Sequence, residues 1–284
     1  MEKFDVTVIG SGPGGYVAAI RCAQLGMKTA LIEKYPTLGG TCLNVGCIPS
    51  KALLDSSEHF HNAVHTFTTH GIDIKGEVQV NLKQMIERKN GVIKQTCDGI
   101  DFLMKKNKVD VFKGIGSFVT KNTIKVSGEK EETIETDKVI IATGSKPSSL
   151  PGVEIDKKRV ITSTEALNMT EVPKHLIVIG GGPSGYAGAM RAIDFGKKVL
   201  LIEKKKIGGA GVYNGVLASK TLWEQALKVA SIRELIPDYE VNFNDISKTV
   251  NEAVFERKTQ MTVHLQLLQK EKNRLFYYDK GSAY

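Results

Sequence analysis

The 284-residue sequence predicts an α/β protein with two related three-layer units, of which the second is incomplete. Residues 8–34 and residues 178–204 match without a gap, at the offset that separates Gly10 from Gly180. Each stretch holds a β-branched run, a glycine-rich turn and a segment of small and apolar residues. The composition, with 41% hydrophobic and 25% charged residues, is that of a globular chain.

The length corresponds to about two domains. We expect a first domain over residues 1–150, a connector over 151–174 and a second unit over 175–284. Since no apolar run approaches the roughly 18 residues of a membrane span, and the N-terminus lacks the pattern of a signal peptide, a cytoplasmic protein is expected. The net charge of +8 is spread along the chain, so we do not expect nucleic-acid binding.

Strands are predicted at Val6–Ile9 and Leu176–Ile179, each followed by a glycine turn and a helix. A second strand then ends in an acid, at Glu33 in the first copy and at Glu203 in the second. Strand, GxGxxG turn, helix, strand and terminal acid form the Rossmann-like dinucleotide-binding unit. The sequence therefore predicts two such units.

The glycines have distinct physical roles in this unit. Gly10 permits the tight turn, Gly12 lets the backbone approach a pyrophosphate, and Gly15 lets the helix pack on the strand. An acid after the second strand can bind both hydroxyls of a ribose, which favours FAD or NAD over a 2′-phosphorylated nucleotide. Glycines that serve only packing are the alternative, and this alternative fits the second copy better. The candidate binding residues of the two turns are Gly10, Gly12, Pro13, Gly14, Gly15 and Glu33, and Gly180, Gly182, Gly185 and Glu203.

The four cysteines, Cys22, Cys42, Cys47 and Cys97, are too few for a disulfide scaffold of this length. On an ideal helix, the Cα atoms of residues spaced as Cys42 and Cys47 are roughly 8–9 Å apart. A disulfide needs about 4.4–6.8 Å, so a bridge requires a distorted helix, and Gly46 supplies the backbone freedom. Two reduced structural cysteines are an alternative. A zinc site is not expected, because no second Cys/His pair stands at ligand spacing.

The segment GGTCLNVGCIPSKALL, residues 39–54, together with the first glycine turn and the later Ile141–Ser145 turn, closely resembles the flavoprotein disulfide reductases. These enzymes form the class I pyridine nucleotide-disulfide oxidoreductases. Within them, the sequence is most similar to dihydrolipoamide dehydrogenase over residues 3–165.

The resemblance implies a catalytic disulfide between Cys42 and Cys47. Cys42 would be the exposed sulfur that exchanges with a dithiol such as dihydrolipoamide, and Cys47 the sulfur against the flavin. Electrons would pass from dithiol to disulfide to FAD to NAD, and the family implies a 2-oxo acid dehydrogenase complex as a partner. Further residues implied to contact FAD are Lys34, Gly40, Thr41, Lys51, Gly116, Thr143, Gly144 and Ser145.

The second copy departs from the family pattern. Ala187 stands where the family has a glutamate, and Gly211 and Val216 stand where the first copy has cysteines. The family's C-terminal interface domain, with its His-Glu base, has no counterpart in this sequence, so a homodimer is not expected. The alternative function is therefore a non-catalytic FAD- or nucleotide-binding protein.

Overall fold

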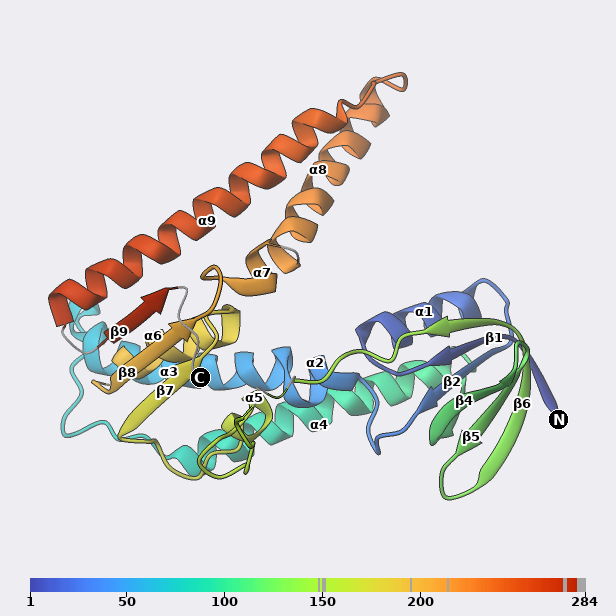
Figure 1. Ribbon diagram of the computed structural model, residues 1–284, viewed down its shortest axis with the longest axis horizontal. Coiled ribbons are helices and arrows are strands. Elements are labelled where there is room, and N and C mark those ends of the chain that lie inside the picture. Colours follow the sequence, from blue (N-terminus) through green and yellow to red (C-terminus); the bar gives the residue numbers. More distant parts are fainter. Residues whose placement is uncertain (148, 150–151, 195, 214, 273–274, 280–284) are drawn as a thin grey trace. The chain divides into compact units, whose positions relative to one another are not determined.

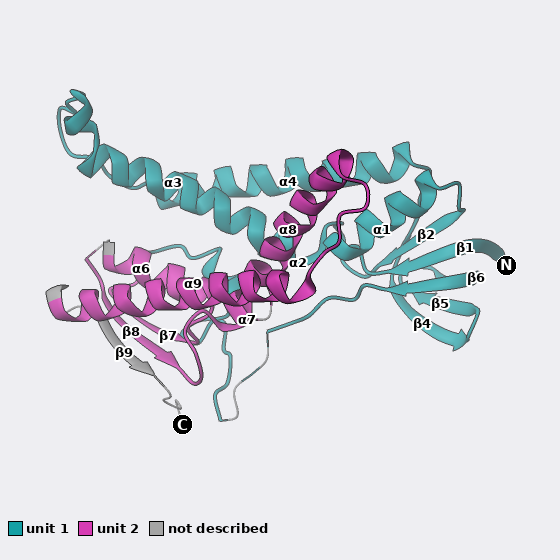
Figure 2. Ribbon diagram, turned by 90° about the horizontal axis from the view of Figure 1, so that it is seen from above, with its two compact units in different colours: residues 1–171 teal, residues 172–284 magenta. Residues whose placement is uncertain are grey.

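The computed structural model describes residues 1–147, 149, 152–194, 196–213, 215–272 and 275–279. The chain divides into two compact units, Met1–Glu171 (unit 1) and Val172–Tyr284 (unit 2), which Figure 2 shows in different colours. The expected connector over 151–174 thus falls mostly within unit 1. No described helix is long and apolar enough to cross a membrane.

Unit 1 is built on a six-stranded sheet with the order β3-β2-β1-β6-β5-β4. Figure 1 labels the strands β1, β2, β4, β5 and β6 of this sheet. Strands β1, β2, β3 and β6 are parallel, whereas β4, β5 and β6 form an antiparallel meander. The central strand β1 pairs with β2 on one side and with β6 on the other. The strands are β1 (Glu2–Ile9), β2 (Thr29–Glu33), β3 (Asp110–Lys113), β4 (Ile115–Thr120), β5 (Thr123–Ser127) and β6 (Glu131–Ile141).

Helices cover one face of this sheet. There Val8 and Leu31 pack with Ala19 of α1 and with Cys97 and Met104 of α4. The helices are α1 (Pro13–Gln24), α2 (Gly40–Val45), α3 (Cys47–His65), the 3₁₀ turn η1 (Phe67–His70), α4 (Leu82–Lys106) and α5 (Ser163–Ala166).

The meander covers the other face. Ile32 of β2 packs with Ile124 and Val126 of β5 and Ile134 of β6. A Cβ atom at Gly116 of β4 would lie 3.2 Å from the Ile32 side chain, so β4 also reaches back over β2. Helices, parallel sheet and meander make three layers, and the predicted α/β class is confirmed for unit 1.

A buried lysine on α4 binds the segment that follows α5 near the end of unit 1. Lys89 of α4 is 1% exposed, and its Nζ donates to the Leu167 carbonyl at 2.9 Å and to Asn168 Oδ1 at 2.6 Å. Burial lowers the pKa of this ammonium group. The chain that follows α5 is thereby held on α4.

Unit 2 repeats the first strands and helix of unit 1. Its sheet has the order β7-β8-β9, all parallel, and its core joins Val199 and Leu201 to Ala189 of α6 and Leu265 of α9. The elements are β7 (His175–Ile179), α6 (Pro183–Asp194), β8 (Lys198–Glu203), α7 (Gly209–Tyr213), α8 (Val216–Leu235), α9 (Phe243–Lys272) and β9 (Leu275–Asp279).

The second face of the unit 2 sheet is different. Ile177 and Ile179 of β7 are 64% and 47% exposed, whereas Ile9, the counterpart of Ile179, is buried beneath the meander of unit 1. The described part of unit 2 therefore has a helix layer and a sheet layer. The predicted Rossmann-like α/β class holds for unit 2 as well. Among the described residues no strand covers this face, as expected for the incomplete copy of the repeat.

Candidate active site

The first glycine turn lies at the C-terminal end of β1, where ligands bind in open parallel sheets. Gly10 has a φ of +101°, and a Cβ atom there would lie 2.3 Å from the Ala142 carbonyl oxygen. A Cβ atom at Gly15 would lie 1.8 Å from the Gly10 oxygen. Packing therefore requires glycine at both positions.

Gly12 and Gly14 have another explanation. A Cβ atom at either position would meet no protein atom within 4 Å, so the protein's own packing does not require glycine there. Gly12 is also the N-cap residue of α1, a 12-residue helix whose N-terminal dipole end favours an anion. The turn thus fits the close approach of a phosphate-bearing ligand.

The acid that ends β2 closes this turn. Glu33 is 5% exposed, and its Oε2 accepts hydrogen bonds from the backbone N–H of Ser11 at 2.8 Å and from its hydroxyl at 2.6 Å. Its Oε1 accepts a bond from the backbone N–H of Tyr35 at 2.9 Å. Burial alone would raise the pKa of Glu33, but the bonds from Ser11 and Tyr35 outweigh burial and the net pKa is lowered. The carboxylate that is expected to bind a ribose therefore also stabilises the backbone of the glycine turn through its bonds with Ser11 and Tyr35.

Unit 2 builds its turn in the same way. Glu203 accepts hydrogen bonds from the backbone N–H groups of Gly181 at 2.6 Å and Lys205 at 2.8 Å. A Cβ atom at Gly185 would lie 2.0 Å from the Gly180 oxygen, whereas one at Gly182 would meet nothing within 4 Å. Packing requires glycine at Gly185 as it does at Gly15, the positive φ of +104° favours glycine at Gly180, and Gly182 is open like Gly12.

The cysteine pair lies at a break between two helices. Helix α2 ends at Val45, Gly46 has φ −139° and ψ −116°, and α3 begins at Cys47. A Cβ atom at Gly46 would lie 2.7 Å from the Thr41 carbonyl oxygen, so a side chain does not fit there. The predicted distortion of the helix between the cysteines is confirmed. All four cysteines carry free thiols in this structure.

The two thiols differ in environment. Burial raises the pKa of the Cys42 thiol, as does its hydrogen bond with Cys47, while the charge of Lys51 acts in the opposite direction. Lys51 lies one turn after Cys47 on α3, so the structure brings these three residues together. Cys42 is half-buried against the core below α1 and α4, and Cys47 is exposed. The expectation that Cys42 is the exposed sulfur and that flavin covers Cys47 refers to the FAD-bound protein and stays a prediction; without FAD, Cys47 is the more exposed of the two.

The other predicted residues lie around the same end of the sheet. Gly10 would place a Cβ atom 3.2 Å from Thr143 Cα, and Gly144 and Ser145 continue from there. Gly116 lies against Ile9 and Ile32, the side chains at the ends of β1 and β2. Four more predicted residues are exposed to solvent and lie on the glycine turn, after β2 or on the cysteine segment, namely Pro13, Lys34, Thr41 and Lys51.

Three functional candidates were missed in the sequence, namely Ser11, Asn44 and Cys97. Asn44 Nδ2 donates to the carbonyls of Leu38 and Gly40, and Cys97 donates to Asn44 Oδ1 at 3.5 Å. A signal was present for two of them. The repeat places Gly181 at the position of Ser11 and Tyr213 at that of Asn44, so the two copies differ at these positions.

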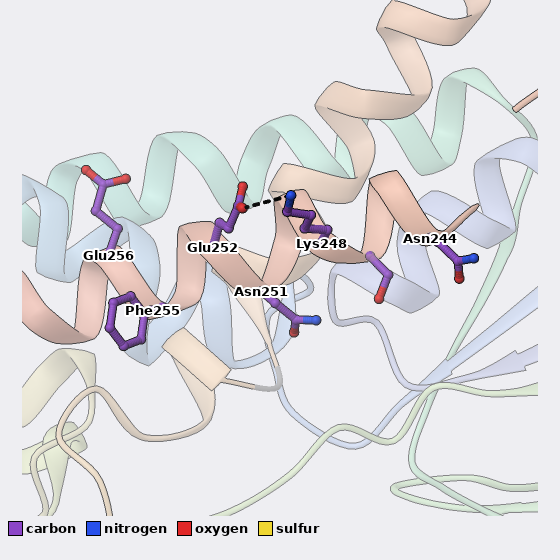
Figure 3. Close-up of a pocket in the computed structure, with 7 residues that line it drawn as sticks. Asn244, Lys248, Asn251, Glu252, Phe255 and Glu256 are labelled. Atoms are coloured by element: carbon purple, nitrogen blue, oxygen red, sulfur yellow. Dashed lines mark ion pairs between the residues drawn. The ribbon is translucent and has the colours of Figure 1, made fainter. Parts of the chain in front are cut away.

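A shallow hollow of about 630 Å³ lies along the N-terminal half of α9 in unit 2. Figure 3 shows its lining side chains, including Lys248 and Glu252, whose charged groups are 4.0 Å apart. None of the residues of the glycine turns or the cysteine segment lines this hollow. Among the described residues, no group of three or more His, Cys, Asp or Glu side chains could hold a metal ion.

Comparisons with known proteins agree with this geometry. Residues 4–207 match the family described as pyridine nucleotide-disulphide oxidoreductase, and residues 175–282 match the family of FAD-dependent oxidoreductases. The chain is 50% identical over 204 residues to the mitochondrial dihydrolipoyl dehydrogenase of Schizosaccharomyces pombe, covering 71% of this chain and 40% of that protein. It is 51% identical over 204 residues to the leghemoglobin reductase of Glycine max, covering 71% of this chain and 39% of that protein.

Among solved structures, the HOCl-induced flavoprotein disulfide reductase RclA from Escherichia coli has the same fold, with a TM-score of 0.62 and 22% identity. That match covers 98% of this chain and 49% of RclA. The chain spans about 40% of the length of the curated relatives it matches. Because the match to the first family covers most of the sequence and includes both the glycine turn and the cysteine pair, this chain belongs to the pyridine nucleotide-disulphide oxidoreductase family.

Proposed function

We propose that this chain acts as an FAD-dependent disulfide oxidoreductase of the dihydrolipoamide dehydrogenase type. The observation that carries the proposal is the helix break at Gly46 between Cys42 and Cys47, where the backbone packs so closely that a Cβ atom at Gly46 would lie 3.1 Å from Cys42 Cα. The pair stands on a segment that leaves the glycine turn directly, since a Cβ atom at Gly40 would lie 2.6 Å from Gly12 Cα. A redox pair and a dinucleotide cradle are therefore adjacent in one unit.

Bound FAD would supply a two-electron acceptor, and NAD would receive the electrons afterwards. Unit 1 provides the residues to hold FAD. The open side of Gly12 and Gly14 admits the pyrophosphate, and the N-terminus of α1 favours its charge. Lys51 adds a positive charge beside the cysteines.

The residues of the pair divide the exchange chemistry between them. In the oxidised protein, a thiolate of the substrate attacks Cys42 Sγ, a mixed disulfide forms, and the sulfur of Cys47 leaves as a thiolate. The second substrate thiol then attacks the substrate sulfur of the mixed disulfide, which releases the substrate disulfide and a Cys42 thiolate. Two electrons have then moved from the dithiol to the cysteine pair.

The test uses the full chain loaded with FAD under anaerobic conditions. Dihydrolipoamide should reduce the oxidised protein and yield two new protein thiols, counted by alkylation and mass spectrometry. Cys42→Ser and Cys47→Ser should abolish the reaction, whereas the control Cys22→Ser should retain it. If FAD does not bind, or if the dithiol reacts equally with the Cys42→Ser protein, the proposal is wrong.

A nucleotide-binding role without dithiol chemistry is favoured for unit 2. Its turn repeats the cradle of unit 1, but a Cβ atom at Gly211 would lie 2.3 Å from the Pro183 ring, so a cysteine does not fit there. We propose that unit 2 binds an adenine nucleotide such as NAD. Gly182→Val should abolish this binding in calorimetry, whereas binding that persists would contradict the proposal.

The proposed substrate and partner follow from the proposed activity, and the proposed location follows from the sequence pattern described above. We propose dihydrolipoamide as the dithiol, a 2-oxo acid dehydrogenase complex as the partner and a cytoplasmic location. The names of some relatives state a mitochondrial location, and subcellular fractionation distinguishes the two compartments. Sedimentation of the purified chain tests its oligomeric state.

A further inference from the structure

Asn44 lies between the two cysteines, and its side-chain amide uses every hydrogen bond that it can form. Nδ2 donates to the Leu38 carbonyl at 3.0 Å and to the Gly40 carbonyl at 2.9 Å. Oδ1 accepts from Thr37 Oγ1 at 2.7 Å and from Cys97 Sγ at 3.5 Å. An amide has two N–H groups and two acceptor positions. Since a carbonyl can only accept, the NH₂ group must face Leu38 and Gly40.

These partners connect the glycine turn to the cysteine segment. The backbone N–H of Gly39 donates to the Ser11 carbonyl at 3.0 Å and to the Ser11 hydroxyl at 3.2 Å. The neighbouring Gly40 is pressed against Gly12, since a Cβ atom at Gly40 would lie 2.6 Å from Gly12 Cα. Asn44 therefore ties the segment 37–40, which lies on the cradle, to the helix that carries Cys42.

Helix α2 cannot fix its own position. It has six residues, stands between Gly39 and Gly46, and has no side-chain cap at its N-terminus. Isolated helices of this length are marginal in water. Leu43, which is 4% exposed, holds α2 by apolar packing, and Asn44 holds it by polar contacts. The orientation of Cys42 consequently depends on Asn44.

Unit 2 provides an internal comparison. The repeat places Tyr213 at the position of Asn44, in the same unit in which Gly211 and Val216 replace the cysteines. The turn itself persists there, because the Gly208 N–H donates to the Gly181 carbonyl at 2.7 Å. The turn therefore forms without the amide, and the amide is present only in the unit that carries the cysteine pair.

We propose that Asn44 is a positioning residue that couples occupancy of the glycine turn to the reactivity of Cys42. This inference rests on the proposed function, in which FAD lies on the turn and the dithiol reacts at Cys42. A ligand in contact with Gly12 moves or restrains Gly40, and the amide of Asn44 carries that constraint to α2. The thiol of Cys42 then reacts in a different orientation when the turn is occupied.

The test compares the full-length wild type with Asn44→Leu, Asn44→Asp and the control Asn107→Asp. Asn107 also donates its side-chain amide to a backbone carbonyl, that of Leu103 at 2.8 Å, but at the end of α4. The rate of iodoacetamide alkylation at Cys42 is measured across pH by peptide mapping, with and without saturating FAD. FAD affinity is measured in parallel by fluorescence titration.

In the wild type and in Asn107→Asp, FAD should change the Cys42 rate by about tenfold or more, because a 1 Å displacement of a reacting group can change its rate by on the order of 10²-fold. In both Asn44 variants this change should fall below about twofold, while FAD affinity stays within about threefold of the wild type. Thr37→Val removes one of the four bonds at an exposed site, so it should reduce the FAD effect partly without unfolding the protein.

Asn44 variants that bind FAD and keep the tenfold change would overturn this inference alone, as would a wild type that binds FAD with no change at Cys42. Equal losses of FAD affinity and of the FAD effect would also overturn it, because they indicate a purely structural role. Failure of the wild type to bind FAD would overturn the proposed function as well. If the Asn44 variants do not fold, a Thr37→Val protein identical to the wild type overturns the inference.

Discussion

At the scale of single residues, two acidic side chains occupy equivalent positions in the two glycine turns. Each carboxylate accepts a hydrogen bond from the backbone N–H of the residue that follows the first glycine of the turn, Ser11 or Gly181. Each also accepts one from the backbone N–H of the residue two positions after the acid itself, Tyr35 or Lys205. Unit 1 adds the hydroxyl of Ser11, which donates to Glu33 and accepts from the Gly39 N–H. The same carboxylate that is expected at a ribose thus also sets the shape of the turn.

Glu33→Ala should therefore lower both stability and dinucleotide affinity. It leaves the buried N–H and hydroxyl donors of Ser11 without an acceptor, which costs about 1–3 kcal/mol of the free energy of unfolding. Because the pKa of Glu33 is lowered by folding, its contribution is fully present above the unfolded pKa and is lost as pH falls through the folded pKa. Urea denaturation of both proteins at several pH values checks this. A difference that does not shrink in acid would contradict the assignment.

The reactivity of the cysteines can be predicted separately. In the reduced protein without FAD, the exposed Cys47 should alkylate faster than Cys42, because Cys42 is half-buried and burial raises its pKa. Saturating FAD should reverse this order by covering Cys47. On oxidation, a Cys42–Cys47 disulfide should form, with Cys22 and Cys97 remaining free. Peptide mapping measures all three outcomes, and a bridge to Cys22 or Cys97 would refute the pairing.

At the scale of elements, the junction of α2 and α3 determines the geometry of the pair. A continuous helix would hold the Cα atoms of Cys42 and Cys47 roughly 8–9 Å apart, beyond the span of a disulfide. The break at Gly46 removes this constraint and starts α3 at Cys47. The equivalent junction in unit 2 has Gly215 with nearly the same dihedral angles before α8, although no cysteines flank it. The break is thus a property of the repeated unit.

Gly46→Ala should disrupt this junction. The added Cβ atom would lie 2.7 Å from the Thr41 oxygen, and crowding of this kind typically costs about 1–3 kcal/mol. The fraction of Cys42–Cys47 disulfide formed under mild oxidation should fall. Gly99→Ala is the matched control, since a Cβ atom there meets nothing within 4 Å on α4, and it should raise stability by about 0.5–1 kcal/mol. Thermal melts and peptide mapping of both variants decide the outcome.

The sequence predicts the elements of this site better than its contacts. Strands, glycine turns and the break at Gly46 follow from local chemistry, since each depends on residues within a few positions. The environment of Asn44 does not, because one of its partners, Cys97, is 53 positions away on α4. The exposure of Cys47 and the partial burial of Cys42 could not be read from the motif either, because they depend on how α2 and α3 pack on the core. Contacts between distant segments are set by packing, which the local pattern does not specify.

At the scale of the whole molecule, the chain consists of two compact units that share one plan and differ in chemistry. The cysteine pair, the glycine turn and every contact of Asn44 lie within Met1–Glu171. Lys89 fastens residues 167 and 168, shortly before the boundary, to the same unit. The proposed dithiol chemistry is thus contained in unit 1.

Residues 1–171 expressed alone should therefore fold cooperatively, bind FAD and form the Cys42–Cys47 disulfide. A compact unit with its own core is expected to fold independently. Calorimetry should show a single transition, and FAD titration should give an affinity close to that of the full chain. A shortened protein that is unfolded, or that loses FAD binding, would show that unit 2 contributes to the site.

The bare face of unit 2 has a consequence for the behaviour of the protein in solution. Among the described strands, β7 hydrogen-bonds only to β8, whereas its counterpart β1 is flanked on both sides. An unprotected sheet edge offers unpaired N–H and C=O groups to strands of other molecules, and Ile177 and Ile179 add apolar surface beside it. We expect concentrated protein to aggregate through β7, measurable as light scattering that rises with concentration. Ile177→Lys, which places a charge on this edge strand, should suppress the scattering without changing the chemistry of unit 1.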